Sequence, residues 1–215
     1  MKKVVLIGDS IRLGYQNYVK SSLDGVAEVY SPEENCRFAQ YVLRYAQEWK
    51  RLGNWPDDID LVHWNEGAWD VLRIYDDEPL TPPEVYGAFI KRIDKRLRDI
   101  FPKAKFIFAT TCSVVEEGYY GDIYQRYNKD VEEYNKIALD ALKDTDTVIN
   151  DLYSLTTTLP AECRSDMTHF NTPEGVKMLG GQVLSYVCKV LDVKTEQLAK
   201  ADCIPPIISK NILGL

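Results

Sequence analysis

The chain has 215 residues, of which 45% are hydrophobic and 27% are charged. This composition is that of an ordinary globular protein rather than a disordered or collagen-like chain, and the length suits one sizeable domain. The 26 Lys and Arg residues against 33 Asp and Glu residues give a net charge of −7. Because such a surface repels phosphate backbones and anionic membranes, the charge disfavours nucleic acid and membrane partners.

The N-terminal apolar run, Val4–Ile7, is shorter than the roughly 7 to 15 residues of a signal-peptide core. No stretch approaches the roughly 20 apolar residues of a membrane-spanning helix. The five cysteines are odd in number and form no Cys-x-x-Cys pair, which favours free thiols over disulfides or a zinc cluster. We therefore expect a cytoplasmic protein. The cysteines are Cys36, Cys112, Cys163, Cys188 and Cys203.

Short apolar runs rich in β-branched residues recur along the chain at long spacing. Continuous runs of this kind are typical of strands that are buried on both faces of a parallel sheet. They predict about five strands, at Lys3–Ile7, Ala27–Tyr30, Asp60–Trp64, Lys105–Thr110 and Thr147–Asn150.

Helical periodicity fills the gaps between these runs. Thr81 and Glu84 match a capping box, with Pro82 at the first helical position, and Pro102 ends the pattern. Thr172 and the proline after it predict the start of another helix near the C-terminus. The alternation of strands and helices predicts an α/β protein, a doubly wound three-layer αβα sandwich.

The C-terminal segment departs from this pattern. We assign residues 1–192 to one domain and residues 193–215 to a tail, whose apolar stretches lie near Ile204–Ile208 and Ile212–Leu213. Because exposed apolar strings are usually covered, we expect the tail to pack on the domain or on a neighbouring subunit. A homo-oligomer is therefore left open.

Reactive side chains follow the predicted strands at their carboxyl ends, where open parallel sheets bind ligands. Ser10 follows the first strand at a predicted helix N-terminus, whose partial positive charge favours an oxyanion. Asn65 follows the third, and a side-chain amide there is one solution for stabilising an acyl-transfer oxyanion. The alternative for Ser10 is a helix cap, and for Asn65 a turn residue.

Asp166 lies three residues before His169, just ahead of the last helix. A carboxylate at this spacing can accept the Nδ1 proton of the imidazole and leave Nε2 free as a general base for Ser10. The alternative is that His169 only buttresses the helix. His63, the other histidine, follows a predicted buried strand and lies two residues before Asn65, so we expect it to line the pocket or to make a core hydrogen bond.

Two other chemistries are disfavoured. A metal site built from both histidines and a carboxylate matches no metal-binding spacing, so no metal is expected. A thiol nucleophile at Cys36 or Cys112 is disfavoured because neither lies at the turn that Ser10 occupies.

Together, Gly8-Asp9-Ser10, Asn65 and the Asp166/His169 pair resemble the SGNH, or GDSL, hydrolases, and they follow that family's order along nearly the whole chain. The resemblance implies a flavodoxin-like αβα fold and a serine esterase. It also implies Ser10 as nucleophile, Asp166 and His169 as its triad partners, and an oxyanion hole that includes Asn65 and the Ser10 N–H.

Two blocks depart from the family pattern. Cys36 stands where the family has the glycine whose N–H completes the oxyanion hole, so the resemblance implies a donor at Cys36 or at Asn35. The third block reads His63-Trp64-Asn65-Glu66 instead of Gly-x-Asn-Asp, which suggests a reshaped pocket. We expect the substrate-binding residues to be Arg37, His63, Trp64 and Glu66.

Further runs, among them Ala109-Thr110-Thr111, are similar to bacterial carbohydrate O-acetyl esterases. This resemblance implies a small ester substrate, an acylated sugar that loses a short acyl group such as acetyl, and no cofactor. Two alternatives remain open. One is a lysophospholipase or thioesterase type of acyl hydrolase, and the other is a catalytically silent carbohydrate-binding protein with this fold.

Overall fold

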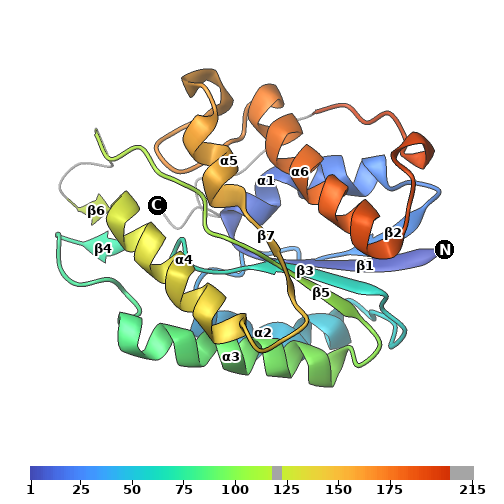
Figure 1. Ribbon diagram of the computed structural model, residues 1–215, viewed down its shortest axis with the longest axis horizontal. Coiled ribbons are helices and arrows are strands. Elements are labelled where there is room, and N and C mark those ends of the chain that lie inside the picture. The colour runs from blue at the N-terminus through green and yellow to red at the C-terminus, as the bar shows by residue number, and fades with distance from the viewer. Residues whose placement is uncertain (118–122, 204–215) are drawn as a thin grey trace.

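A five-stranded parallel sheet forms the centre of the molecule, with helices on both faces (Figure 1). The computed structural model describes residues 1–117 and 123–203. The strand order is β2-β1-β3-β5-β7, and a separate antiparallel pair joins β4 to β6. This confirms the predicted three-layer sandwich with about five strands. The strands are β1 (Lys2–Ile7), β2 (Ala27–Tyr30), β3 (Leu61–Asn65), β4 (Arg73–Ile74), β5 (Lys105–Ala109), β6 (Tyr124–Gln125) and β7 (Val148–Asn150).

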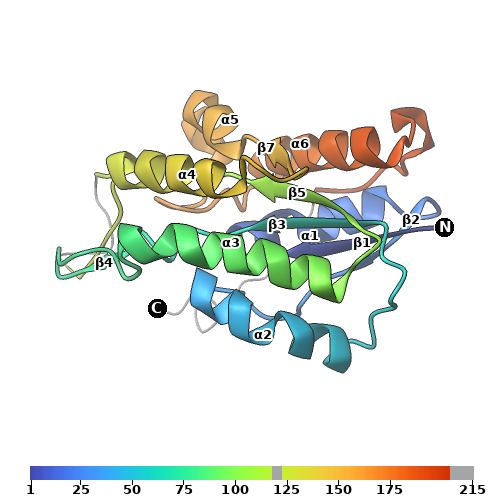
Figure 2. The same cartoon turned by 60° about the horizontal axis from the view of Figure 1, so that its bottom comes forward.

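Two helical layers cover the sheet. Helices α1, α5 and α6 lie on one face, and α2, α3 and α4 lie on the other, with α2 at the outer edge of its layer (Figure 2). Two short 3₁₀ turns follow α5 and α6. The helices are α1 (Ser10–Ser22), α2 (Ala39–Leu52), α3 (Pro83–Ile100), α4 (Asn128–Leu142), α5 (Leu152–Thr158) and α6 (Pro173–Leu191), and the turns are Ala161–Cys163 and Thr195–Gln197.

Alternating side chains of each central strand enter two separate cores. In β1, Val5 and Ile7 pack against the α2–α4 layer, whereas Val4 and Leu6 pack under α1 and α6. The chain leaves β1 toward β2 on one side and returns to β3 on the other. In a parallel sheet this reversal opens a crevice beyond the carboxyl ends of the two strands, so the fold places a site after β1 and β3.

The predicted cap of α3 is wrong, whereas that of α6 is confirmed. Thr81 does not cap α3; its hydroxyl donates to Asp70 Oδ1 at 2.6 Å, and α3 begins at Pro83 without a side-chain cap. At α6, Thr172 Oγ1 accepts a hydrogen bond from the Gly175 N–H at 3.1 Å. Asp70 also accepts a hydrogen bond from the Ala39 N–H. One carboxylate, distant in sequence, therefore binds the residues at the starts of both α2 and α3.

The segment after α6 returns along α1 as far as residue 203. Leu198 packs against the core under α1 and α6, and the Ala199 N–H donates to the Ser22 carbonyl at 2.9 Å. The apolar stretches of the expected tail, residues 204–215, lie outside the described residues. In the part of the chain that the structure describes, no helix is long and apolar enough to cross a membrane. The five cysteines are all free thiols, as predicted.

Candidate active site

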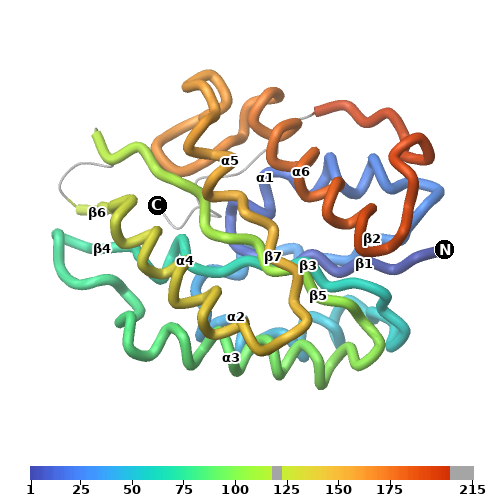
Figure 3. Tube along the Cα trace, in the orientation of Figure 1, coloured from blue at the N-terminus to red at the C-terminus, as the bar shows by residue number. Residues whose placement is uncertain are grey.

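Three side chains from distant parts of the chain form one hydrogen-bonded series. Ser10 Oγ lies 2.8 Å from His169 Nε2, and His169 Nδ1 lies 2.8 Å from Asp166 Oδ2. Figure 3 traces β1 directly into α1, which begins at Ser10, and follows the segment between α5 and α6 that carries the other two residues. The structure therefore brings together the serine, the histidine and the carboxylate that the sequence singled out.

The turn from β1 into α1 sets the position of Ser10. Asp9 caps α1, since its Oδ1 accepts the Ile11 N–H at 2.9 Å, which leaves the Ser10 hydroxyl free of any capping duty. Burial raises the pKa of Asp9, although the Ile11 N–H, the Asn65 side chain and nearby cationic groups oppose this effect. The Ser10 N–H lies in the first helical turn, where backbone N–H groups have no acceptor within the helix. The capping alternative thus applies to Asp9 and not to Ser10.

The loop before α6 orients the imidazole. Asp166 Oδ1 accepts the backbone N–H groups of Thr168 and His169 at 2.7 Å each, so the carboxylate is fixed by the turn that it closes. Burial raises the pKa of Asp166, but the hydrogen bond from His169, its charge and these backbone donors outweigh burial and lower the pKa to about 2. An ionised Asp166 keeps the proton on Nδ1, so Nε2 can accept the proton of Ser10.

Asn65 ends β3 beside the β1–α1 turn. Gly8 makes its close approach possible, because a Cβ at Gly8 would lie 2.0 Å from Asn65 Oδ1. The Asn65 side chain is only 4% exposed. The buried amide therefore packs against Gly8, two residues before Ser10, and its N–H group remains the predicted oxyanion donor.

The expected oxyanion donor at Cys36 is contradicted by the structure. Its N–H donates to the Gly8 carbonyl at 3.2 Å and is therefore occupied. The N–H of Arg37 is also occupied, since it donates to Asn35 Oδ1 at 2.8 Å, and Arg37 has the left-handed backbone (φ 60°) that favours glycine. The Ser10 N–H and the Asn65 amide remain from the prediction, and the alternative donor at Asn35 stays a prediction. The Cys36 thiol is buried, and burial raises its pKa, as it does for Cys112.

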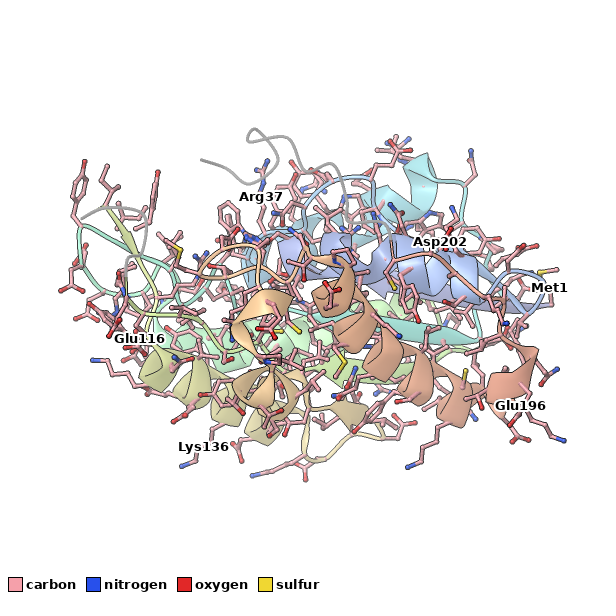
Figure 4. All side chains as sticks on the ribbon, turned by 90° about the horizontal axis from the view of Figure 1, so that it is seen from above. Met1, Arg37, Glu116, Lys136, Glu196 and Asp202 are labelled. Atoms are coloured by element: carbon pink, nitrogen blue, oxygen red, sulfur yellow. The ribbon has the colours of Figure 1, made fainter. Side chains whose placement is uncertain are left out.

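The predicted substrate-binding role is wrong for three of the four residues. His63, Trp64 and Glu66 are fully buried and cannot contact a substrate. Trp64 packs into the α2–α4 core with its ring 4.7 Å from Phe108. His63 points to the opposite face, where its Nε2 lies 3.2 Å from Asn150 Nδ2; this is the core hydrogen bond that the sequence left as an alternative. Only Arg37 is exposed, and its side chain projects from the surface in Figure 4.

His63 should make folding stability depend on pH. Burial lowers its pKa from an ordinary value near 6.5 to about 3. As the pH falls below 6.5, His63 binds a proton in the unfolded chain but stays neutral in the folded chain. The free energy of unfolding therefore decreases toward pH 3. Between about pH 7.5 and about pH 5, wild type should lose about 2 kcal/mol more free energy of unfolding than His63→Phe.

Urea denaturation of both proteins at the two pH values measures this difference. Carboxylates that titrate in the same range are common to both chains and cancel, as does the hydrogen bond to Asn150 that His63→Phe loses at either pH. Equal pH dependence in the two proteins would contradict a buried neutral His63.

Arg12 is a structural residue that the sequence did not reveal. Its guanidinium is fully buried and donates to three backbone carbonyls, at Gly8 (3.1 Å), Pro32 (2.9 Å) and Glu34 (2.5 Å). It thereby fixes the loop after β2 against the turn that carries Ser10. From the sequence, a charged residue in the first turn of a helix is expected to lie on the surface, since arginine is almost never fully buried unless it is partnered.

Buried carboxylates lie beneath the site. Neither carboxylate oxygen of Glu66 has a hydrogen-bond partner within the described ranges, and burial, followed by nearby Asp70 and Asp9, raises its pKa well above the usual value. Burial also raises the pKa of Asp70 to about 7, against the opposing bonds from Thr81 and Ala39. Across residues 1–117 and 123–203, no cluster of three or more His, Cys, Asp or Glu side chains is arranged to hold a metal ion.

Comparison with known proteins gives structural relatives only. No family model matches the chain, and no curated protein matches its sequence. A lipase/acylhydrolase from Enterococcus faecalis has a TM-score of 0.68 at 19% identity, covering 94% of this chain and 100% of that one. An acetyl xylan esterase from Geobacillus stearothermophilus has a TM-score of 0.64 at 17% identity (86% and 94% covered). A GDSL-like lipase from Bacteroides thetaiotaomicron has a TM-score of 0.63 at 17% identity (87% and 88% covered). The chain therefore has the fold of the SGNH/GDSL hydrolases.

Proposed function

We propose that this protein is a serine ester hydrolase. The observation that carries the proposal is the series from Ser10 Oγ through His169 to Asp166, with 2.8 Å at each step. A hydroxyl, an imidazole and an ionised carboxylate in this order form the arrangement that activates a serine for acyl transfer.

The reaction proceeds in two halves. Ser10 Oγ attacks the acyl carbonyl while His169 Nε2 takes its proton, and the Ser10 N–H and the Asn65 amide stabilise the oxyanion. Collapse of the intermediate breaks the ester bond, and His169 returns the proton to the leaving alcohol. Water then attacks the acyl-enzyme with the same histidine as base, which releases the acid and regenerates Ser10. The chain's own side chains and backbone supply every protein group in these steps, so no cofactor is part of the proposal.

We further propose a short acyl group, such as acetyl, on a carbohydrate as the substrate. One of the structural relatives is an acetyl xylan esterase, and the net charge of −7 suits a neutral sugar better than an anionic lipid surface. Arg37 is exposed directly after the loop that Arg12 fixes, where its guanidinium could donate to sugar hydroxyls. The lipase/acylhydrolase relative supports a longer acyl chain as the second candidate.

The length of the acyl chain separates these two candidates. We expect kcat/KM for 4-nitrophenyl acetate to exceed that for the octanoyl ester by about ten-fold or more, because a pocket shaped for a short acyl group excludes a long one. A clear preference for octanoate would overturn the acetyl proposal and favour the lipase type.

A fluorophosphonate probe tests the nucleophile independently of the substrate. It should label wild type and fail to label Ser10→Ala, since the probe reacts only with an activated serine. Absence of labelling on folded wild type would favour the catalytically silent alternative.

A further inference from the structure

A groove of about 590 Å³ opens between α1 and α2, over the carboxyl end of the edge strand β2. Three aromatic residues line it: Tyr30, Trp49 and Trp55, with the rings of Tyr30 and Trp55 6.5 Å apart. The volume falls within the range of small-molecule sites, roughly 300 to 1,000 Å³. Its polar lining consists of Gln16, Asn17, Lys20, Ser31, Glu33 and Glu34.

An aromatic ridge on α2 continues this groove toward the candidate active site. It consists of Phe38, Tyr41 and Tyr45, which are all half-buried. The guanidinium groups of Arg37 and Arg44 lie over the rings of Tyr41 and Tyr45, each 5.0 Å from the ring centroid. Ring centroids lie 6.1 Å apart from Phe38 to Tyr41 and 4.4 Å apart from Tyr41 to Tyr45. Tyr41 is also 6.0 Å from the ring of Trp49 in the groove, so the ridge and the groove form one continuous surface.

A single carboxylate joins the two parts. Glu34 accepts the Tyr41 hydroxyl and the Trp49 indole N–H at 2.8 Å each. The two rings are thus held in fixed orientations before any ligand arrives, which lowers the entropy cost of binding on them. Fixed ring orientations of this kind are typical of a preformed binding site rather than of scattered surface aromatic residues.

We infer that this surface, the groove together with the aromatic ridge, binds the carbohydrate chain of the substrate. Aromatic rings offer flat apolar faces for the C–H faces of sugar rings, and amide and carboxylate groups beside them pair with hydroxyls. A lipid chain would instead favour a continuous apolar lining, which the six polar residues of the groove interrupt. The inference rests on the proposed function and narrows it to oligomeric or polymeric sugar esters.

The loop after β2 connects this surface to the candidate active site. Its Glu33 and Glu34 line the groove, whereas its far end at Cys36 bonds to the Gly8 carbonyl beside Ser10. Arg12 holds the loop from beneath through the Glu34 carbonyl. A chain bound along the ridge would therefore pass Arg37 and reach the serine with its acyl groups.

Binding is tested without catalysis. Tryptophan fluorescence of Ser10→Ala should respond to unacetylated xylohexaose, mannohexaose or cellohexaose, because Trp49 lines the groove. The double variant Tyr30→Ala/Tyr41→Ala should raise the Kd about ten-fold or more, since each ring contributes stacking. Tyr75→Ala, which removes an equally large ring that is 73% exposed elsewhere, should leave the Kd unchanged.

Kinetics separate failure of this inference from failure of the proposed function. The same double variant should raise KM for an acetylated hexasaccharide about ten-fold, with kcat and the hydrolysis of 4-nitrophenyl acetate retained. Tyr41→Phe keeps the ring but loses the hydrogen bond to Glu34, so it should raise the Kd less than the double variant does. Active wild type that binds none of the three sugars, or a double variant with unchanged Kd and KM, overturns the inference while leaving the esterase proposal standing. Octanoate-dependent fluorescence without a sugar response would assign the groove to lipid instead.

Discussion

Replacing Ser10 with alanine is expected to lower kcat/KM for 4-nitrophenyl acetate by about 10⁴-fold or more. His169 Nε2 lies 2.8 Å from the Ser10 hydroxyl that attacks, and alanine offers no atom to form the acyl-enzyme. What activity remains would come from the oxyanion donors acting on water. The measurement is initial-rate hydrolysis with purified wild type and variant.

The structure supplies a matched control for this experiment. Ser22 is a second buried serine at the opposite end of α1, and Ser22→Ala should retain the wild-type rate. Ser10→Ala should itself fold normally, because Asp9 and not Ser10 caps the helix. Full activity in a folded Ser10→Ala protein would refute the serine mechanism.

The strands were predictable because burial on both faces leaves a continuous apolar run. Each of the five predicted runs overlaps an observed strand with ends that differ by at most one residue, as Lys105–Ala109 illustrates against the predicted Lys105–Thr110. Short sequence motifs also predicted a helix cap correctly where the capped N–H is close in sequence, as for Thr172 at the start of α6. The Thr81 cap failed because its hydroxyl finds Asp70, a partner that belongs to another segment and that only the folded chain brings near.

The same distinction holds in the candidate site. Asp166 and His169 lie three residues apart, so their pairing could be predicted from spacing alone. The sequence could not show which face of the sheet each β3 side chain points to. Both faces are covered by helices, and every residue of the strand is buried. His63 and Trp64 therefore entered the two cores instead of a pocket.

Backbone donors are harder still to predict from sequence. The motif indicates which residue stands in the glycine position, but the direction of the Cys36 N–H depends on the loop that Arg12 fixes. A buried guanidinium that is satisfied by carbonyl groups leaves no periodic or compositional trace. Residues that hold a site in place through backbone contacts are for this reason invisible to motif reasoning.

Gly8→Ala is expected to reduce ester hydrolysis about as much as loss of the Asn65 amide, roughly 10² to 10³-fold. The new Cβ would lie 2.0 Å from Asn65 Oδ1, 2.8 Å from its Cγ and 3.0 Å from Arg12 Cβ. Asn65 is buried at the end of a central strand, so it can relieve the contact only by leaving its position beside Ser10. The overpacking should also cost about 1 to 3 kcal/mol in free energy of unfolding.

A double-mutant cycle distinguishes displacement of Asn65 from general damage. Asn65→Ala alone should lower the activity by the same factor, and adding Gly8→Ala to it should cost little more, because the two atoms nearest the new Cβ, Asn65 Oδ1 and Cγ, are gone. Part of the stability that Gly8→Ala loses should return in the double variant for the same reason. Gly181→Ala serves as the matched control, since a Cβ there meets nothing within 4 Å. Additive activity losses in the cycle, or a fully active Gly8→Ala, would show that the proximity of Gly8 to Asn65 does not govern the oxyanion donor.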